Sequence, residues 1–333
     1  MPIDPSPPLD PPAAALVRHV EAQLVPADEA ARVARYLEAG SAASTRRAYA
    51  QSWAAWTAWC ALRSLDPLPA SAEALAVYLS ARAEAGIAPR TLQRDLAGIV
   101  AAHRAAGAAS PREHPGVRAV LRGIRRTHGM APRQKAPLTL DDLGAALPRG
   151  DRPRAVRDRA LLLLGFAAAL RRSELVALDI GDLQDCPEGL VVTLRGSKTD
   201  PERVGTLLGV PYARRKTLCA VRAVARWRTE LAQAGELGPA LFRPVDRHGR
   251  IGAVRLSDRA VAELVKEAAA RAGLDPAIFG GHSLRAGFAT SAVAAGLAEH
   301  DIMRQTRHRS ILVFRGYVRR GGLFLDNAAG KLL

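Results

Sequence analysis

The chain has 333 residues and a formal net charge of +16 at pH 7, which predicts two domains and a polyanionic partner. It contains no run of about 18 apolar residues and no secretory leader, which argues against a membrane protein. Its three cysteines, Cys60, Cys186 and Cys219, are widely spaced, which argues against a disulfide framework or a zinc site and favours a cytoplasmic protein.

The first part of the chain predicts a small helical bundle. Residues 1–12 are rich in proline and predict a disordered tail, and residues 13–40 predict one or two helices. From 41 to 136 basic residues strongly outnumber acidic ones. Apolar periodicity in this basic part predicts four helices: one capped by Ser44 or Thr45, then 71–85, one beginning at Pro89, and 114–126.

The polar faces of these four helices are basic. They carry Arg46, Arg47, Arg90, Gln93, Arg94, Arg118, Arg122, Arg125 and Arg126. An ordinary solvated face is the alternative interpretation. Few carboxylates lie between these residues, however, so such a face would repel itself without a partner.

The second part of the chain predicts helices around a small pair of strands. Residues 127–137 lack periodicity and contain Gly and Pro, which is typical of an interdomain linker. Strands are predicted at 190–194 and 204–210, joined by a polar loop that contains Lys198. The predicted helices are 140–147 capped by Thr139, 156–168, one capped by Ser173, 217–234 and 257–272.

The C-terminal part carries polar residues at short spacings. A helix over 283–295 is predicted from a buried apolar stripe, and it ends at Gly296. This places His282 at the start of the helix and Arg285 in its first turn, where both face one ligand and where an anion is favoured. A further helix is predicted from Ser310, with Tyr317 beside its buried face. That face is formed by Ile311, Phe314 and Val318.

Cleavage of a phosphodiester by a tyrosine needs a nucleophile, several cations and proton donors, and this part of the chain supplies most of them. With these residues the chain resembles the tyrosine recombinases, also called the phage integrase family. The resemblance covers residues 41–317, and the layout is similar to the two-domain recombinases of the Cre and Xer types. Its motifs are His282-Ser283-Leu284-Arg285, His308, Tyr317, the earlier box Ala169-Leu170-Arg171-Arg172-Ser173-Glu174-Leu175, and Lys198 in a predicted hairpin.

The resemblance implies a nucleophile and its immediate partners. Tyr317 is expected to attack the scissile phosphate, form a 3′-phosphotyrosyl link and free a 5′-hydroxyl, which allows rejoining without ATP. Arg171 and Arg285 are expected to bind the non-bridging oxygens, because a planar guanidinium matches phosphate bidentately. Lys198 is expected to protonate the departing 5′-oxygen.

The remaining site residues are assigned supporting roles by the same resemblance. His282 is expected to assist proton transfer at Tyr317, and His308 is expected to hydrogen-bond the phosphate. Glu174 is expected to support the architecture of the site rather than take part in chemistry. Because fixed cations substitute for a metal ion, we expect neither a metal nor a cofactor.

For the whole chain the resemblance implies a mainly α (α+β) fold. A helical core-binding (SAM-like) domain is expected at 13–126, and a catalytic domain, helical with a small antiparallel β-sheet, at 138–320. The expected partner is double-stranded DNA. The residues expected to contact it are Arg46, Arg47, Arg90, Gln93, Arg94, Arg122 and Arg125.

The apolar chain end, 321–333, predicts assembly. It carries Leu323, Phe324 and Leu325 after two glycines, which favours insertion into a neighbouring protomer and a homo-tetramer on two DNA sites. An intramolecular helix that completes the core is the alternative.

Two positions depart from the family pattern, in which both are often glycine: Ala169 and Arg307. The departure at Ala169 concerns the tightness of the turn, and Arg307 is expected either to touch DNA or to be exposed. Two other functions stay open, a type IB topoisomerase and a DNA-binding regulator with a vestigial site. The small helical N-terminal domain and the apolar tail favour recombination over the first, and retention of all six catalytic groups argues against the second.

Overall fold

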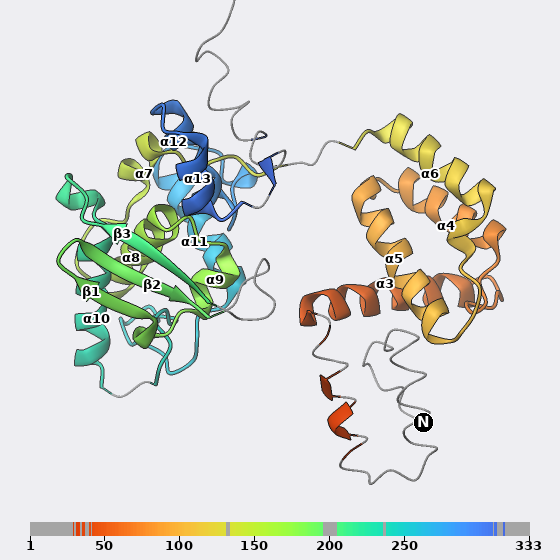
Figure 1. Ribbon diagram of the computed structural model, residues 1–333, viewed down its shortest axis with the longest axis horizontal. Helices are drawn as coiled ribbons and strands as arrows, with labels where there is room; N and C mark the ends of the chain where they lie inside the picture. Colours follow the sequence, from red (N-terminus) through yellow and green to blue (C-terminus); the bar gives the residue numbers. More distant parts are fainter. Residues whose placement is uncertain are drawn as a thin grey trace, which may run out of the picture. The chain divides into compact units, whose positions relative to one another are not determined.

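The computed structural model describes residues 29, 31–33, 35–36, 40, 42–130, 134–195, 205–235, 238–308, 310–311 and 316. Contacts divide the chain into two compact units, Met1–Arg133 and Gln134–Leu333, drawn in orange to yellow and in green to blue in Figure 1. Helices dominate both units and the second adds a small antiparallel sheet, which confirms the mainly α (α+β) fold. The predicted tails, 1–12 and 321–333, lie outside the described residues. Within the described part, no helix is long and apolar enough to cross a membrane.

The N-terminal unit is a helical bundle in which α3 packs on α5 and α4 packs on α6. Its core contains the fully buried Trp56 and Cys60, as helical spacing predicts. The Trp56 ring stacks on that of Trp59, with 5.5 Å between centroids. The elements are α3 (Ala43–Ala61), α4 (Ala72–Glu84), α5 (Pro89–Ala105), a 3-10 turn (Pro111–Glu113) and α6 (Pro115–His128).

Helices α3 and α5 approach each other closely at Gly98. A Cβ atom on Gly98 would lie 2.8 Å from the Cβ of Ser52 and 3.0 Å from the carbonyl oxygen of Tyr49. The Ser52 hydroxyl also donates to the buried carboxylate of Asp95 at 2.9 Å. A close backbone approach and a buried hydrogen bond therefore join the two helices at this point.

The predicted starts of these helices are right at two positions and wrong at one. The Ser71 hydroxyl accepts the N–H of Ala74 at 3.0 Å, and Pro89 is the first residue of α5. Helix α3 begins at Ala43, ahead of the predicted cap, and its N-cap residue Ala42 makes no side-chain hydrogen bond. The backbone carbonyl of Ala42 already accepts the N–H of Thr45 at 2.8 Å, so the first turn forms without a side-chain cap.

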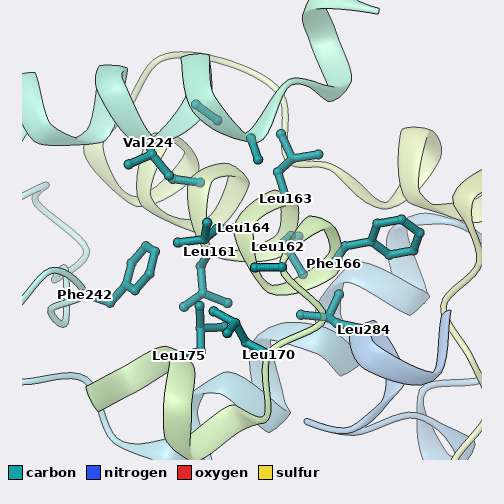
Figure 2. Packing of buried hydrophobic residues seen from close by; sticks show 14 of the residues in the cluster. Leu161, Leu162, Leu163, Leu164, Phe166, Leu170, Leu175, Val224, Phe242 and Leu284 are labelled. Carbon is teal, nitrogen blue, oxygen red and sulfur yellow. The ribbon is translucent and has the colours of Figure 1, made fainter. Parts of the chain in front are cut away.

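The second unit is built around α8, which is buried almost all round, as its apolar sequence predicts. Figure 2 shows the leucines of α8 with Val224 of α10, Leu175 of α9 and Leu284 of α12 directed towards them. Its helices are α7 (Leu140–Ala146), α8 (Pro153–Ala167), α9 (Arg172–Ala177), α10 (Ala220–Gln233), α11 (Asp258–Arg271), α12 (Ser283–Ala294) and α13 (Glu299–Thr306), with 3-10 turns at Ile180–Asp182, Lys216–Leu218 and Pro276–Ile278.

The sheet has the strand order β1-β2-β3 and is antiparallel throughout. Its strands are β1 (Leu183–Cys186), β2 (Gly189–Leu194) and β3 (Thr206–Pro211). Strands β2 and β3 correspond to the predicted pair. Strand β1 was not predicted, because only Leu183 of its four residues is buried and the strand carries no readable alternation.

The end of the predicted linker belongs to the second unit. The N–H of Ala136 donates to Ile278 O at 2.8 Å, and the N–H of Leu138 donates to Ser283 O at 3.0 Å. Leu138 lies so close to α12 that a Cβ atom on Gly287 would be 1.7 Å from its carbonyl oxygen. Glycine is therefore required at this point of α12.

Candidate active site

The first arginine box follows a tight reversal at the end of α8. The N–H of Leu170 donates back to Gly165 O at 3.0 Å, and Ala169 adopts the left-handed conformation with φ +46°. This conformation favours glycine, but the turn stays tight with alanine. Arg171 then occupies the N-cap position of α9, so the predicted cap at Ser173 is wrong. Ser173 lies one residue inside the helix, and the side chain that accepts the N–H of Arg171 is Glu174, at 2.9 Å.

The carboxylate of Glu174 binds two guanidinium groups. Its side chain is 3% exposed and accepts from Arg171 Nη1 at 2.5 Å and from Arg307 Nη2 at 2.7 Å. Burial on its own would raise the pKa of Glu174, but Arg307 and then the hydrogen bonds and charge of Arg171 outweigh it and lower the pKa below its usual value. The site therefore contains an ionised carboxylate that holds two cations.

The second box lies at the start of α12, as predicted. His282 is the N-cap residue, and Arg285 in the first turn is 1% exposed. Arg285 Nη1 donates to the carbonyl oxygen of Ala169 at 2.9 Å, which joins the second box to the turn of the first. Burial, followed by the charges of Arg285 and Arg171, lowers the pKa of His282, so its imidazole is neutral at neutral pH.

His308 follows α13, a helix that was not predicted because few of its side chains are buried. The hydroxyl of Thr306 donates to Ile302 O at 2.7 Å and lies 2.8 Å from His308 Nδ1. Burial, then the charges of Arg285 and Arg171, lower the pKa of His308 to about 3. His308 therefore lies within electrostatic reach of both arginines.

The largest difference from expectation is Arg307. The prediction that it touches DNA stays a prediction, but its side chain is only 9% exposed, so the prediction that it is solvent-exposed is wrong. The physical reason is its pairing with Glu174, a partner that lies far away in the sequence.

Two predicted catalytic residues, Lys198 and Tyr317, lie outside the described residues. Arg195, the last described residue before the Lys198 loop, pairs with Asp182 at 2.5 Å and with Asp179 at 3.0 Å. In the helix predicted after Ser310, Ile311 is 43% exposed, so its predicted place on a buried face is wrong.

The predicted DNA-contact residues lie on α3, α5 and α6 of the N-terminal unit. They are exposed or partly exposed, and one of them, Arg94, lies 3.4 Å from the carboxylate of Asp95. Arg46 and Arg47 lie near the start of α3, Arg90 lies in the first turn of α5, and Arg122 and Arg125 lie on α6. The basic residues are thus spread over three helices. The set is Arg46, Arg47, Arg90, Gln93, Arg94, Arg122 and Arg125.

Arginines around an ionised carboxylate, with two neutral imidazoles, suit the binding of an anion such as a phosphate group. The sequence profile of the phage integrase family matches residues 138–321. The chain is 39% identical over 304 residues to an integrase/recombinase xerD homolog of Selenomonas ruminantium, covering 90% of this chain and 88% of that protein. It is 32% identical over 293 residues to the tyrosine recombinase XerC of Mycobacterium sp. (strain KMS), covering 84% of this chain and 89% of that protein.

Among solved structures, the fold is similar to the XerH site-specific recombinase bound to its palindromic difH substrate. The TM-score is 0.59 at 18% identity, over 98% of this chain and 91% of that chain. The chain belongs to the phage integrase family of tyrosine recombinases. It is a site-specific recombinase, an enzyme that cleaves and rejoins DNA strands through a phosphotyrosyl intermediate.

Proposed function

We propose that Tyr317 attacks a DNA phosphodiester whose non-bridging oxygens are bound by Arg171 and Arg285, and that Lys198 protonates the departing 5′-oxygen. The observation that carries this proposal is the convergence of both arginines on the turn after α8. Arg171 is held by Glu174 and Arg285 by the carbonyl oxygen of Ala169. Guanidiniums that are fixed before the substrate binds need no reorganisation when charge develops on the phosphate.

His308 has a defined tautomer in this proposal. The single hydrogen of the Thr306 hydroxyl is donated to Ile302 O, so the hydroxyl accepts from His308 Nδ1–H. Nε2 of the neutral ring is then an acceptor, and His308 can donate to a phosphate oxygen only in its protonated form. A bound phosphate raises the pKa of His308 because it offsets the positive charge of Arg285 and Arg171. Neutral His282 is the group that accepts the proton of Tyr317.

The nucleophile is tested with Tyr317→Phe on a nicked duplex that traps the covalent adduct. Removing the single hydroxyl oxygen should abolish the adduct while leaving folding and DNA binding intact. Tyr212→Phe is the matched control, because Tyr212 is a half-exposed tyrosine of the same unit whose ring lies beneath Arg222. An adduct formed by Tyr317→Phe would show that another residue is the nucleophile.

We further propose that the enzyme acts as a homo-tetramer on two double-stranded DNA sites and that the chain end of one protomer enters a groove of its neighbour. The catalytic unit has an apolar groove of about 550 Å³ between α7, α8, β3, α12 and α13. Leu143, Leu163, Phe166, Phe288 and Ile302 contribute to its lining. The apolar residues Leu323, Phe324 and Leu325 suit such a groove.

Deletion of residues 323–333 tests this assembly. Donation to a neighbour predicts a folded protein that binds one site with unchanged affinity but loses cooperative pairing and recombination. Unfolding of the truncated protein would instead assign the tail to its own core. Normal recombination would exclude any role of the tail in assembly.

A further inference from the structure

Arg307 adopts a conformation that its residue type disfavours. It ends α13 in the left-handed region with φ +56°, where a Cβ atom is strained and glycine is preferred. Its pKa is lowered by burial, against which the charge of Glu174 acts. A strained, buried cation persists only where its surroundings determine its conformation fully.

The guanidinium of Arg307 binds the C-terminal end of α8 and Glu174 at once. Nη1 donates to Ala168 O at 3.2 Å and to Gln305 O at 3.1 Å. Nη2 donates to Ala169 O at 3.3 Å and to Glu174 Oε2 at 2.7 Å. A cation is favoured at a helix C-terminus, where carbonyl groups have no partner within the helix.

Arg307 shares an acceptor with each of the two arginines assigned to the phosphate. The carbonyl oxygen of Ala169 also accepts from Arg285 Nη1 at 2.9 Å. The carboxylate of Glu174 also accepts from Arg171, through the backbone N–H at 2.9 Å and through Nη1 at 2.5 Å. Nη2 of one guanidinium therefore connects both acceptors while Nη1 binds two further carbonyl groups. A glycine at this position makes none of these contacts, and a lysine, whose one nitrogen has three hydrogens, cannot make all four.

We propose that Arg307 is a positioning residue for DNA cleavage, which acts by fixing Glu174 and the Ala169 carbonyl and through them the orientation of Arg171 and Arg285. The proposal rests on the function assigned above to those two arginines. It makes the site of this chain a cluster of three arginines, two directed to the phosphate and one that holds their acceptors. His308 follows Arg307 directly in the sequence, so the same contacts fix the place of His308 at the end of α8.

The test uses full-length protein with Arg307→Gly, which relieves the left-handed strain, and Arg307→Lys, which keeps the charge. Both should bind target DNA within about threefold of the wild type and form the covalent adduct at least tenfold more slowly in single turnover, since an acceptor of each phosphate arginine is no longer fixed. The matched control is Arg243→Lys, because Arg243 is another buried arginine that donates to carbonyl groups outside the site. It should lower the Tm without changing the cleavage rate.

A positioning residue acts through its partners, so the loss caused by Arg307→Gly should be smaller in an Arg171→Ala background than in the wild type, because only the path through Arg285 is left. A folded Arg307→Gly or Arg307→Lys protein that cleaves within twofold of the wild type overturns the proposal. The proposal is also overturned if the losses of cleavage rate caused by Arg307→Gly and Arg171→Ala are fully additive. It is overturned as well if an equal loss of DNA binding explains the loss of cleavage, or if both Arg307 variants unfold. The Tyr317→Phe variant tests the proposed function separately from the role of Arg307. If Tyr317→Phe still forms the covalent adduct, the assigned nucleophile is wrong, independently of the result for the Arg307 variants.

Discussion

Arg47, Arg90 and Arg122 of the N-terminal unit are exposed, whereas Arg285 of the catalytic unit and the side chain of Arg307 are almost completely buried. The exposed arginines can adapt to a phosphate backbone of any sequence, and their contribution is screened by salt. The buried arginines are already held by carbonyl oxygens and a carboxylate. In the proposed mechanism, adaptable charge in the N-terminal unit supplies affinity for DNA, and fixed charge in the catalytic unit supplies the chemistry.

The largest expected effect comes from the fixed charges. Arg171→Ala or Arg285→Ala should slow cleavage by roughly a hundredfold or more, the scale seen when a charge-stabilising donor is lost, with little change in DNA affinity. Single-turnover adduct formation measures this. Arg228→Ala is the control, since Arg228 pairs with Asp185 outside the site. Chelator should not change wild-type cleavage, and a strict Mg²⁺ requirement for the cleavage step would contradict the account.

The rigidity on which the fixed charges depend can be tested at two glycines. Gly287→Ala places a methyl group against the backbone oxygen of Leu138 and should destabilise the catalytic unit by about 3 kcal/mol or more. Gly98→Ala places one 2.8 Å from the Cβ of Ser52 and 3.0 Å from the carbonyl oxygen of Tyr49, a smaller overlap than the 1.7 Å at Gly287, and should cost about 1 to 2 kcal/mol. Hydrogen exchange of peptides from each unit distinguishes the two effects. Equal, small effects would show that the packing of α12 on the Leu138 segment is not rigid.

The exposed arginines of the N-terminal unit should affect DNA affinity and leave the cleavage rate unchanged, the opposite of the effect expected for Arg171 and Arg285. Arg47→Ala, Arg90→Ala and Arg122→Ala should each weaken DNA binding a few-fold and reduce the slope of log K against log salt by about 1. The cleavage rate of DNA that is already bound should not change. Arg104→Ala is the control, because Arg104 is exposed on α5 but lies outside the predicted set. A loss of cleavage rate at saturating DNA would remove the distinction between the two units.

The smallest expected effect is the change of stability with pH that comes from protonation of His308. Burial and the charges of Arg285 and Arg171 lower the pKa of His308 to about 3, so its imidazole should not titrate between pH 8 and 5 in the free protein. The unfolded chain takes up this proton near pH 6.5. Stability should therefore fall as the pH drops below 6.5 towards 3. Histidine NMR signals measure the titration, Arg285→Ala should raise the pKa, and a midpoint near 6.5 in the wild type would contradict the coupling.

Local sequence predicted most of the helices, because their signals are local. Thr139 caps its helix as predicted, Ser71 and Ser257, which begin two predicted helices, are their N-caps, and the two boxes lie on the predicted turn and helix start. The missed elements, β1 and α13, have few buried residues. They are defined by pairing and packing rather than by periodicity.

The role of Arg307 could not be predicted for a different reason. Its burial depends on Glu174, a partner from another part of the fold, and a single sequence does not reveal which distant residues meet. The available signal was the replacement of glycine at two positions, Ala169 and Arg307. The structure shows both in the left-handed conformation, with Arg307 donating to the Ala169 carbonyl.

The covalent intermediate is the defining step of the proposed mechanism. The wild-type protein, trapped on a nicked target duplex and digested to peptides, can be analysed by mass spectrometry. We predict a nucleotide joined through its 3′-phosphate to the peptide that contains Tyr317, and no such link on any other peptide. A nucleotide on a different residue, or one joined through a 5′-phosphate, would contradict the mechanism.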